Sequence, residues 1–283
     1  MAKVDLHIHS TASDGHLSPA EIIHHAAERG LSVIALTDHD SVDGITSALA
    51  AAKAFPKLKV IPGVEISTEI AQGDVHVLGY FIDYTDRELQ VKLAGLRDSR
   101  LKRAKGMLAK LKNLGIHIDW ERVREIAGTG SIGRPHIAQI MLEKGYITSL
   151  KEAFDKYIGR GGPAYVEREK MTPAEAVELI LKANGLPVLA HPFTANNPER
   201  LIVELMASGL IGIEAYYKDY TADKISSLVS LADKYGLIAT GGSDYHGLDI
   251  ANETMIGGVD IPMEAAEQLI ALAKHRALKL ASI

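Results

Sequence analysis

The sequence predicts an α/β protein, built as a parallel sheet or barrel that carries a helical insertion. Short β-branched or apolar runs recur along the chain, and helical patterns lie between several of them. This alternation stops between about residues 86 and 165, where only helical patterns occur. With 283 residues, 47% hydrophobic and 24% charged, the chain is long enough for one large domain with an insertion.

Seven runs have the composition and length of buried strands. They are 3–9, 33–37, 59–66, 75–82, 187–190, 211–216 and 237–241. Helical patterns cover 18–29, 42–54, 172–184, 198–208 and 221–235. Two of these helices share a start signal, because Ser18-Pro19 and Thr172-Pro173 are each followed two residues later by Glu. We expect the hydroxyl residue to cap the helix and proline to take its first position.

The segment 86–165 is predicted to be a helical insertion that separates two parts of a barrel, 1–85 and 166–283. Its leucines recur at helical spacings, as at Leu89, Leu93 and Leu96. Between 97 and 112 one acid, Asp98, faces an excess of basic residues, which are Arg97, Arg100, Lys102, Arg103, Lys105, Lys110 and Lys112. A solvated helix face is the ordinary explanation of such a run, and a substrate-binding cationic lid is the alternative.

Composition narrows the function classes. The formal net charge of -5 argues against a generally cationic coat for nucleic acid. The absence of cysteine excludes disulfides and thiolate ligands, so any metal must be held by imidazole and carboxylate. The N-terminus has no signal-peptide pattern, and no stretch approaches the roughly 18 apolar residues that span a bilayer. A cytoplasmic enzyme that needs no membrane is the expectation.

Side chains able to bind metal lie one or two to a segment, mostly at or just after the end of a predicted strand. They are His7, His9, Asp14, His39, Glu65, His76, His191, Asp244 and His246. His7 and His9 are two apart in a strand, so both side chains leave the same face. The carboxyl ends of parallel strands meet at one mouth, where α/β barrels place their chemistry. The pattern therefore predicts a catalytic metal cluster.

Glu65 is a carboxylate within a strand that is predicted to be buried. Such a group carries a large desolvation cost unless a cation or donor meets it, so a bridging metal ligand is the simplest explanation. Asp5 could also point toward the cluster, but we expect a supporting or structural role for it. The remaining histidines are expected to be ordinary core or surface residues, and they are His16, His24, His25, His117 and His275.

Several motifs together resemble the PHP family, named for polymerase and histidinol phosphatase domains. They are DLHIHS at 5–10, SDG at 13–15, TDHD at 37–40, GVEIS at 63–67, VHVLGY at 75–80, AHP at 190–192 and GSDYH at 242–246. The resemblance implies a distorted (β/α)7 TIM-like barrel with up to three metal ions at its mouth. It also implies three ligand sets, namely His7, His9, Glu65 and Asp244; Glu65, His76 and His191; and Asp14, His39 and His246.

Within the family, SIGRPHIAQ at 131–139 most resembles the stand-alone phosphoesterases that act on nucleotides. The resemblance implies a metal-dependent phosphatase that removes the 3′-phosphate of nucleoside 3′,5′-bisphosphates. Two ions that share Glu65 would lower the pKa of a water, and the resulting hydroxide would attack phosphorus. Two to three divalent ions are expected. Manganese is favoured by the resemblance, and iron or zinc also suit imidazole with carboxylate.

Arg134 is the strongest candidate for substrate binding, because guanidinium can hold a second phosphate with two hydrogen bonds. An ordinary ion pair is the alternative explanation for it. His136 could assist, and Arg160 lies in a glycine-rich turn that could approach a ligand or simply connect back to the barrel. The departing oxygen needs a proton or a positive charge, which a metal or a histidine such as His191 or His246 could supply.

Three other functions stay open. The nearest is a 5′–3′ exoribonuclease or phosphodiesterase acting on short 5′-phosphorylated oligonucleotides, along which the basic segment would track a strand. A non-catalytic metal-binding or polymerase-associated module and an amide or C–N hydrolase are the others. The substrate partner is expected to be a nucleotide or short oligonucleotide, and nothing in the sequence indicates an obligate protein partner.

Overall fold

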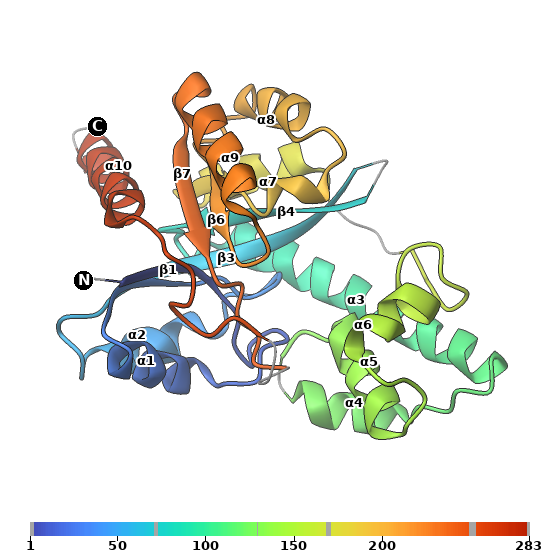
Figure 1. The fold of residues 1–283 in the computed structure, drawn as a ribbon. Helices are drawn as coiled ribbons and strands as arrows, with labels where there is room; N and C mark the ends of the chain where they lie inside the picture. Colours follow the sequence, from blue (N-terminus) through green and yellow to red (C-terminus); the bar gives the residue numbers. More distant parts are fainter. Residues whose placement is uncertain (1–2, 71–72, 129, 168–170, 249–252, 282–283) are drawn as a thin grey trace.

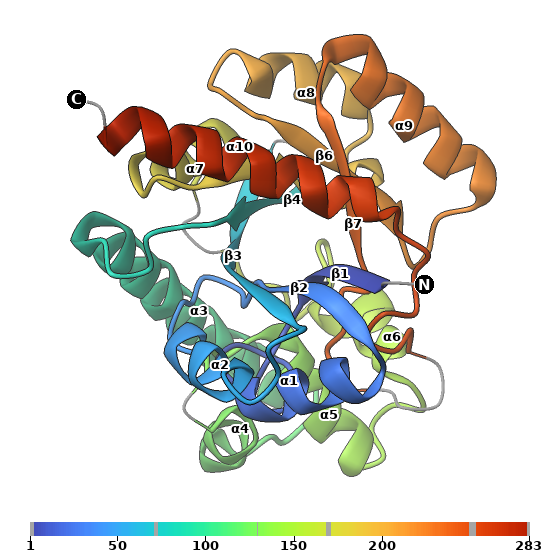
Figure 2. The same cartoon turned by 90° about the vertical axis from the view of Figure 1, so that its left-hand side faces the viewer.

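The computed structural model describes residues 3–70, 73–128, 130–167, 171–248 and 253–281. Seven strands form one sheet and neighbour one another in chain order. They are β1 (Lys3–Ile8), β2 (Leu31–Leu36), β3 (Lys59–Ile70), β4 (Gly73–Tyr80), β5 (Leu186–Leu189), β6 (Gly212–Tyr217) and β7 (Ile238–Gly242). The sheet curls until β7 lies beside β1, as Figure 2 shows. The predicted seven-stranded α/β barrel, in distorted form, is therefore confirmed.

Helices cover the outside of this barrel. They are α1 (Pro19–Glu28), α2 (Ile45–Ala52), α7 (Pro173–Lys182), α8 (Pro198–Met206), α9 (Ala222–Tyr235) and α10 (Met263–Ala281). Both predicted helix starts are confirmed, because Ser18 and Thr172 each form a reciprocal capping box with the glutamate three residues on. None of the described helices combines the length and apolar character that crossing a lipid bilayer requires.

Asp5 ties the first strand to the last. Its buried carboxylate accepts hydrogen bonds from the backbone N–H groups of Ser243 (2.9 Å) and Gly257 (2.8 Å). Gly242 allows β7 to lie close to β1, because a Cβ at this position would be only 2.2 Å from the Cβ of His7. Asp5 thus has the structural role expected of it, and it fixes the strand end that carries His7.

One strand departs from the expected parallel arrangement. β4 runs antiparallel to both β3 and β5, whereas the other neighbouring pairs are parallel. β3 ends at Ile70 and β4 begins at Gly73. This connection is too short for a parallel pair, which needs a crossover of about a dozen residues or more. The amino end of β4 therefore lies at the mouth of the barrel. Consequently His76, opposite Ser67, reaches the mouth from the first half of its strand.

The insertion is a separate group of helices beside the mouth, at the lower right in Figure 1. It contains α3 (Arg87–Asn113), α4 (Trp120–Ala127), α5 (Arg134–Glu143), α6 (Leu150–Ala153) and a π-helical turn, η1 (Phe154–Ile158). The long helix α3 links two hydrophobic clusters. Leu89 and Leu93 pack into a barrel cluster, whereas Met107 and Leu111 pack into a cluster of the insertion. This double anchoring holds the insertion next to the barrel mouth.

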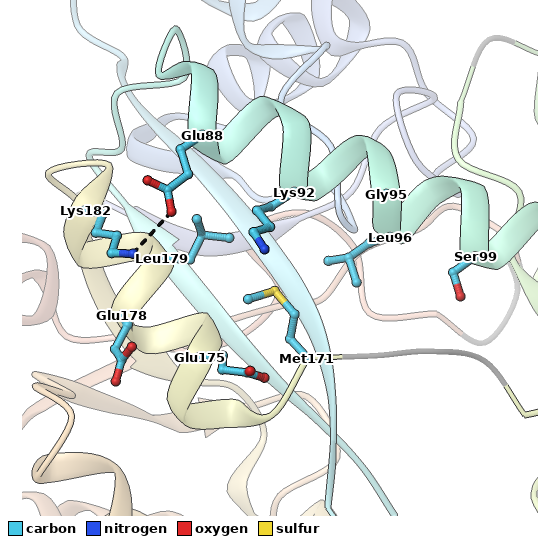
Figure 3. Close-up of a pocket in the computed structure, with 10 residues that line it drawn as sticks. All are labelled: Glu88, Lys92, Gly95, Leu96, Ser99, Met171, Glu175, Glu178, Leu179 and Lys182. Carbon is cyan, nitrogen blue, oxygen red and sulfur yellow. Dashed lines mark hydrogen bonds and ion pairs between the residues drawn. The ribbon is translucent and has the colours of Figure 1, made fainter.

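A groove lies between α3 and α7 on the outside of the barrel (Figure 3). Its lining residues are Glu88, Lys92, Gly95, Leu96, Ser99, Met171, Glu175, Glu178, Leu179 and Lys182. The ammonium of Lys182 lies 3.2 Å from the carboxylate of Glu88 across the groove. Among the described residues that line it, none is a candidate metal ligand, so the groove is distinct from the predicted cluster.

Candidate metal centre

The structure brings all nine candidate metal ligands to the mouth of the barrel, around Glu65. One carboxylate oxygen, Oε2, lies 3.2 Å from Nε2 of His7, 3.2 Å from Nε2 of His9 and 2.9 Å from Nδ1 of His39. The other oxygen, Oε1, lies 2.8 Å from Nδ1 of His76 and 3.2 Å from Nε2 of His191. A single buried carboxylate therefore faces five histidines from four different strands or strand ends.

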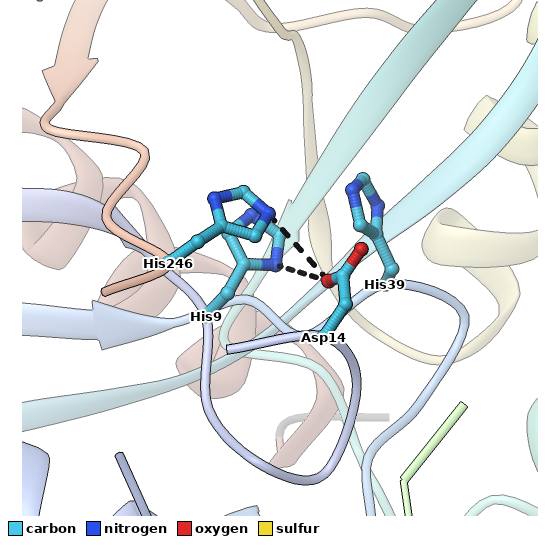
Figure 4. A group of neighbouring side chains, drawn as sticks. All are labelled: His9, Asp14, His39 and His246. Carbon is cyan, nitrogen blue, oxygen red and sulfur yellow. Dashed lines mark ion pairs between the residues drawn. The ribbon is translucent and has the colours of Figure 1, made fainter. Parts of the chain in front are cut away.

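Three groups of donor atoms are close enough to surround ions, with all ligand atoms in a group within 4.8 Å of one another. The groups are His7, His9, Glu65 and Asp244; His39, Glu65 and His76; and His9, Asp14, His39 and His246. Figure 4 shows the last group, with Asp14 pointing toward His9 and His246. The first group equals the set implied by the family resemblance. In the second, His39 stands where the resemblance placed His191.

Many of these atoms are close together without forming hydrogen bonds. Nδ1 of His39 and Oε2 of Glu65 are 2.9 Å apart, yet neither atom has a hydrogen-bond partner. Both ring nitrogens of His9 and Oδ1 of Asp14 are likewise buried and unpartnered. Buried polar atoms are normally satisfied, so their lone pairs need another partner in the space between them. Nitrogen and carboxylate oxygen donors in this arrangement fit divalent metal ions.

The histidines and carboxylates of the cluster shift one another's pKa values, and Glu65 is kept in its ionised form. Burial raises the pKa of Glu65, but His39 and His7 more than compensate and hold it well below its usual value. Burial also lowers the pKa of His9, yet its contacts with Asp244 and Glu65 prevail and raise it to about 9. Burial prevails at His39 and lowers its pKa to about 4. These shifts show that positive charge beside Glu65 and Asp244 is favoured, as expected of a site that binds cations.

Glu214, on β6, is a functional residue that sequence analysis missed. Its fully buried carboxylate lies 2.9 Å from Nδ1 of His7 and accepts a 2.7 Å hydrogen bond from the backbone N–H of His191. A carboxylate behind a histidine holds the ring so that its other nitrogen faces the metal. The sequence could have indicated Glu214, because it is an acidic residue within an apolar strand, as Glu65 is.

Three residues at the mouth have a strained backbone. His191 (φ 27°), Asp244 (φ 46°) and Asp40 (φ 52°) adopt positive φ, which costs free energy in residues other than glycine. Asp244 is held in place by the hydroxyl of Tyr217, which donates to Oδ2 at 2.8 Å, and by Lys218, which donates to its carbonyl oxygen at 2.8 Å. This support leaves Oδ1 of Asp244 facing the histidines of β1.

His246 is fixed by its own segment. Its Nδ1 donates to the carbonyl oxygen of Asp244 at 3.0 Å, so Nε2 is left as the ligand atom, 3.5 Å from Oδ1 of Asp14. Asp14 follows a turn held by Asp38, whose carboxylate accepts hydrogen bonds from the hydroxyls of Ser10 and Ser13. The third group of donors is therefore built by turns that follow three neighbouring strands, β1, β2 and β7.

A cavity lies between the cluster and the insertion. Its lining residues are Asp14, His39, Ser67, Asp74, His76, Arg100, Arg103, Arg134, Pro135, Phe154 and His246. Arg100 is buried and its Nε lies 2.7 Å from Oδ2 of Asp40. Arg134 lies 3.0 Å from Asp74 on β4. The explanation of the basic run as a solvated face is thus wrong for Arg100 and Arg103, which are both buried.

Two other candidate substrate residues lie outside the described lining of this cavity. His136 is buried, and its Nδ1 accepts a 2.9 Å hydrogen bond from the backbone N–H of Gly133, so it caps its own helix. Arg160 is partly exposed, with Nη1 3.5 Å from Glu69 on β3. The geometry gives both residues structural partners and places Arg134 alone of the three at the cavity.

Known proteins resemble this chain over most of its length. A PHP domain model matches residues 5–183. A 3′,5′-nucleoside bisphosphate phosphatase from Chromobacterium violaceum is 36% identical over 251 residues, covering 87% of this chain and 88% of that protein. A 5′-3′ exoribonuclease from Haemophilus influenzae is 36% identical over 248 residues, covering 86% and 90%.

A solved structure agrees with these matches. A candidate metal-dependent phosphoesterase from Bifidobacterium adolescentis superimposes with a TM-score of 0.87 and 25% identity, covering 95% of this chain and 96% of that one. The family model spans the first six candidate ligands, from His7 to His76, and ends before His191. Together with the geometry of the mouth, these matches show that the chain belongs to the PHP family.

Proposed function

We propose that this PHP-family phosphoesterase removes the 3′-phosphate of nucleoside 3′,5′-bisphosphates. The proposal rests chiefly on one juxtaposition: unpartnered metal donors form one wall of a cavity, and arginines form the other. A metal cluster suits the phosphate that reacts, whereas guanidinium suits a phosphate that only binds. The names of the relatives from C. violaceum and H. influenzae support a nucleotide or oligonucleotide substrate.

The ligand sets would be those whose atoms converge, with Glu65 shared between two ions and His9 and His39 at the edge of a third. When bound, divalent ions supply an activated water and neutralise the phosphoryl oxygens. We favour manganese, with iron or zinc compatible with the same imidazole and carboxylate donors. Glu214 holds the ring of His7 in its ligand orientation, and Tyr217 does the same for Asp244.

The insertion wall would bind the second phosphate. Arg134 is about a fifth exposed and pairs with Asp74, so an incoming 5′-phosphate can compete for the guanidinium. Arg103 adds charge to the same wall. Attack of water on the 3′-phosphorus breaks the bond between phosphorus and O3′. The leaving oxygen needs a proton, and among the candidate donors His191 has an Nδ1 without a hydrogen-bond partner, whereas Nδ1 of His246 is occupied.

Phosphate release tests the proposal. The purified protein, loaded with manganese, is incubated with 3′-phosphoadenosine 5′-phosphate and, in parallel, with adenosine monophosphates bearing only one of the two phosphates. We expect rapid release of one phosphate from the bisphosphate and slow release from either monophosphate. No release from the bisphosphate by metal-loaded protein, or equal rates on all three compounds, would contradict it.

The second candidate is 5′–3′ exonuclease activity on short 5′-phosphorylated oligonucleotides. The same site would break the same bond between phosphorus and O3′, with the rest of the strand attached to the reacting phosphate. A parallel incubation with a 5′-phosphorylated RNA oligomer distinguishes a site that does both from a phosphatase alone. Appearance of mononucleotides one by one from the 5′ end is the expected result for an exonuclease.

A further inference from the structure

An aromatic patch, defined here as Phe193, Tyr217 and Tyr220, continues outward from the metal cluster. The ring of His191 lies 5.6 Å from that of Tyr217, which lies 5.1 Å from Tyr220, which in turn lies 5.2 Å from Phe193. Tyr217 ends β6, Tyr220 follows it, and Phe193 lies in η2 (Pro192–Thr194) after β5. The patch therefore belongs to the mouth of the barrel and begins at a candidate ligand.

The patch and the arginine wall adjoin different members of the cluster. The arginine cavity is lined by Asp14, His39, His76 and His246, and no residue of the aromatic patch is among its described lining residues. The patch instead begins at His191. A ligand that binds the arginines and the cluster can thus extend further over the patch.

The composition of the patch suits a nucleobase. Phe193 is 36% exposed, and it is the one aromatic residue among the large apolar side chains exposed in the described part of the chain. Its backbone N–H donates to the hydroxyl of Tyr220 at 3.1 Å, so the two rings are held together. Nζ of Lys224 lies 5.5 Å from the Phe193 ring and 5.6 Å from the Tyr220 ring. Aromatic rings beside a cation are typical of surfaces that bind single-stranded nucleic acid.

We propose that the aromatic patch binds the base on the 3′ side of the scissile phosphate in a 5′-phosphorylated oligonucleotide. This inference rests on the proposed function, in which the arginine wall holds the 5′-phosphate and the cluster holds the reacting phosphate. The first nucleoside then lies between the two walls. The next nucleotide leaves the cluster on the side of His191 and meets Phe193, with Lys224 near its backbone. A bisphosphate ends at the reacting phosphate and has no base to place there.

The inference makes the two substrates respond differently to one substitution. Phe193→Ala should lower kcat/KM for a 5′-phosphorylated diadenylate about tenfold, within the range for loss of one base stack, mainly through KM. It should leave kcat/KM for 3′-phosphoadenosine 5′-phosphate unchanged. Phe193→Trp should keep activity on the dinucleotide. Val203→Ala, which truncates an exposed apolar residue on α8, is the matched control and should affect neither substrate.

Binding gives a readout that does not need turnover. The ligand is a 5′-phosphorylated diadenylate with a methylene group in place of the scissile O3′, compared with the same compound lacking its second base. Calorimetry should give about tenfold tighter binding of the complete ligand to the unchanged protein and no difference with Phe193→Ala. Equal binding of both ligands by the unchanged protein, or equal loss on both substrates in Phe193→Ala, would overturn the inference. Failure to hydrolyse the bisphosphate would instead overturn the proposed function.

Discussion

On the barrel wall of the cavity, Nδ1 of His39 and Oδ1 of Asp14 have no hydrogen-bond partner, whereas on the insertion wall the guanidinium of Arg134 is paired with Asp74. The barrel wall is complete only with added cations. The guanidiniums of Arg100 and Arg134 on the insertion wall already have carboxylate partners, so a phosphate must compete for them. The difference teaches that one wall is built to hold the reacting group and the other to select the molecule attached to it.

Removing the shared ligand should have the largest effect, because two ion sites depend on it. Glu65→Ala is expected to abolish turnover and to reduce the amount of bound metal. Phosphate release and elemental analysis of the purified variant are the measurements, and circular dichroism checks that it is folded. Full activity of Glu65→Ala would show that the cluster does not work as a shared metal site.

The buried arginine of the insertion wall should matter for stability more than for binding. Arg100→Ala leaves the carboxylate of Asp40 buried without its guanidinium, which is expected to cost about 3–5 kcal/mol in the free energy of unfolding. Urea denaturation measures this effect. Arg122→Ala, which removes an exposed arginine paired with Glu125 and Glu143, is the control and should cost about 1 kcal/mol or less. Similar losses in the free energy of unfolding for the two variants would contradict the structural role assigned to Arg100.

Substitution of Glu214, whose carboxylate contacts Nδ1 of His7, should have an intermediate effect on metal affinity or activity. Glu214→Gln is expected to lower metal affinity or activity about 10- to 100-fold, because supporting groups behind metal-bound histidines have effects of this size. Metal titration by calorimetry checks it. Glu204→Gln, which alters an exposed glutamate on α8, is the control. Unchanged metal binding in Glu214→Gln would remove Glu214 from the supporting structure.

The partly exposed Arg134 of the insertion wall should affect substrate recognition. Arg134→Ala is expected to raise KM for the bisphosphate by about tenfold or more, with a smaller change in kcat, since a hydrogen-bonded charge is lost from the phosphate that does not react. Arg160→Ala is the matched comparison and should change KM little, because Arg160 lies outside the described lining of the cavity. Equal effects of the two variants would place both arginines, or neither, at the substrate.

The smallest expected effect is a pH dependence of the stability of the metal-free protein, through His9 in the cluster. Burial lowers the pKa of His9, but Asp244 and Glu65 outweigh it and raise the pKa to about 9, above the unfolded value of about 6.5. Its protonation therefore stabilises the fold fully below pH 6.5, and this stabilisation is lost as pH rises through 9. Metal affinity should rise over the same range, because imidazole binds metal only when neutral.

The thermal midpoint of metal-free protein between pH 6.5 and 9.5 tests this pH dependence. It should fall with increasing pH in the unchanged protein and in His25→Gln, which alters an exposed histidine on α1. It should fall less in His9→Gln. A thermal midpoint that rises with pH would contradict the prediction that protonated His9 stabilises the fold.

The order of strands and helices and the line of ligand residues could be predicted from the sequence. The periodicities of strands and helices are local, and so are the helix starts at Ser18 and Thr172. They can therefore be recognised without knowledge of distant contacts. The position of His7, His39 and Asp244 at strand ends is equally local, and it was sufficient to predict that these side chains share one mouth.

Tertiary structure alone decided how the ligands are grouped and supported. Whether His39 or His191 joins Glu65 and His76, and whether Arg134 meets Asp74, depends on distances between atoms far apart in the chain, which no local pattern encodes. The antiparallel direction of β4 and the role of Glu214 had local signals, namely a short connection and a buried acid. Their consequences became visible only once the strands were side by side, because a charge in a strand acquires its function from the partner that faces it.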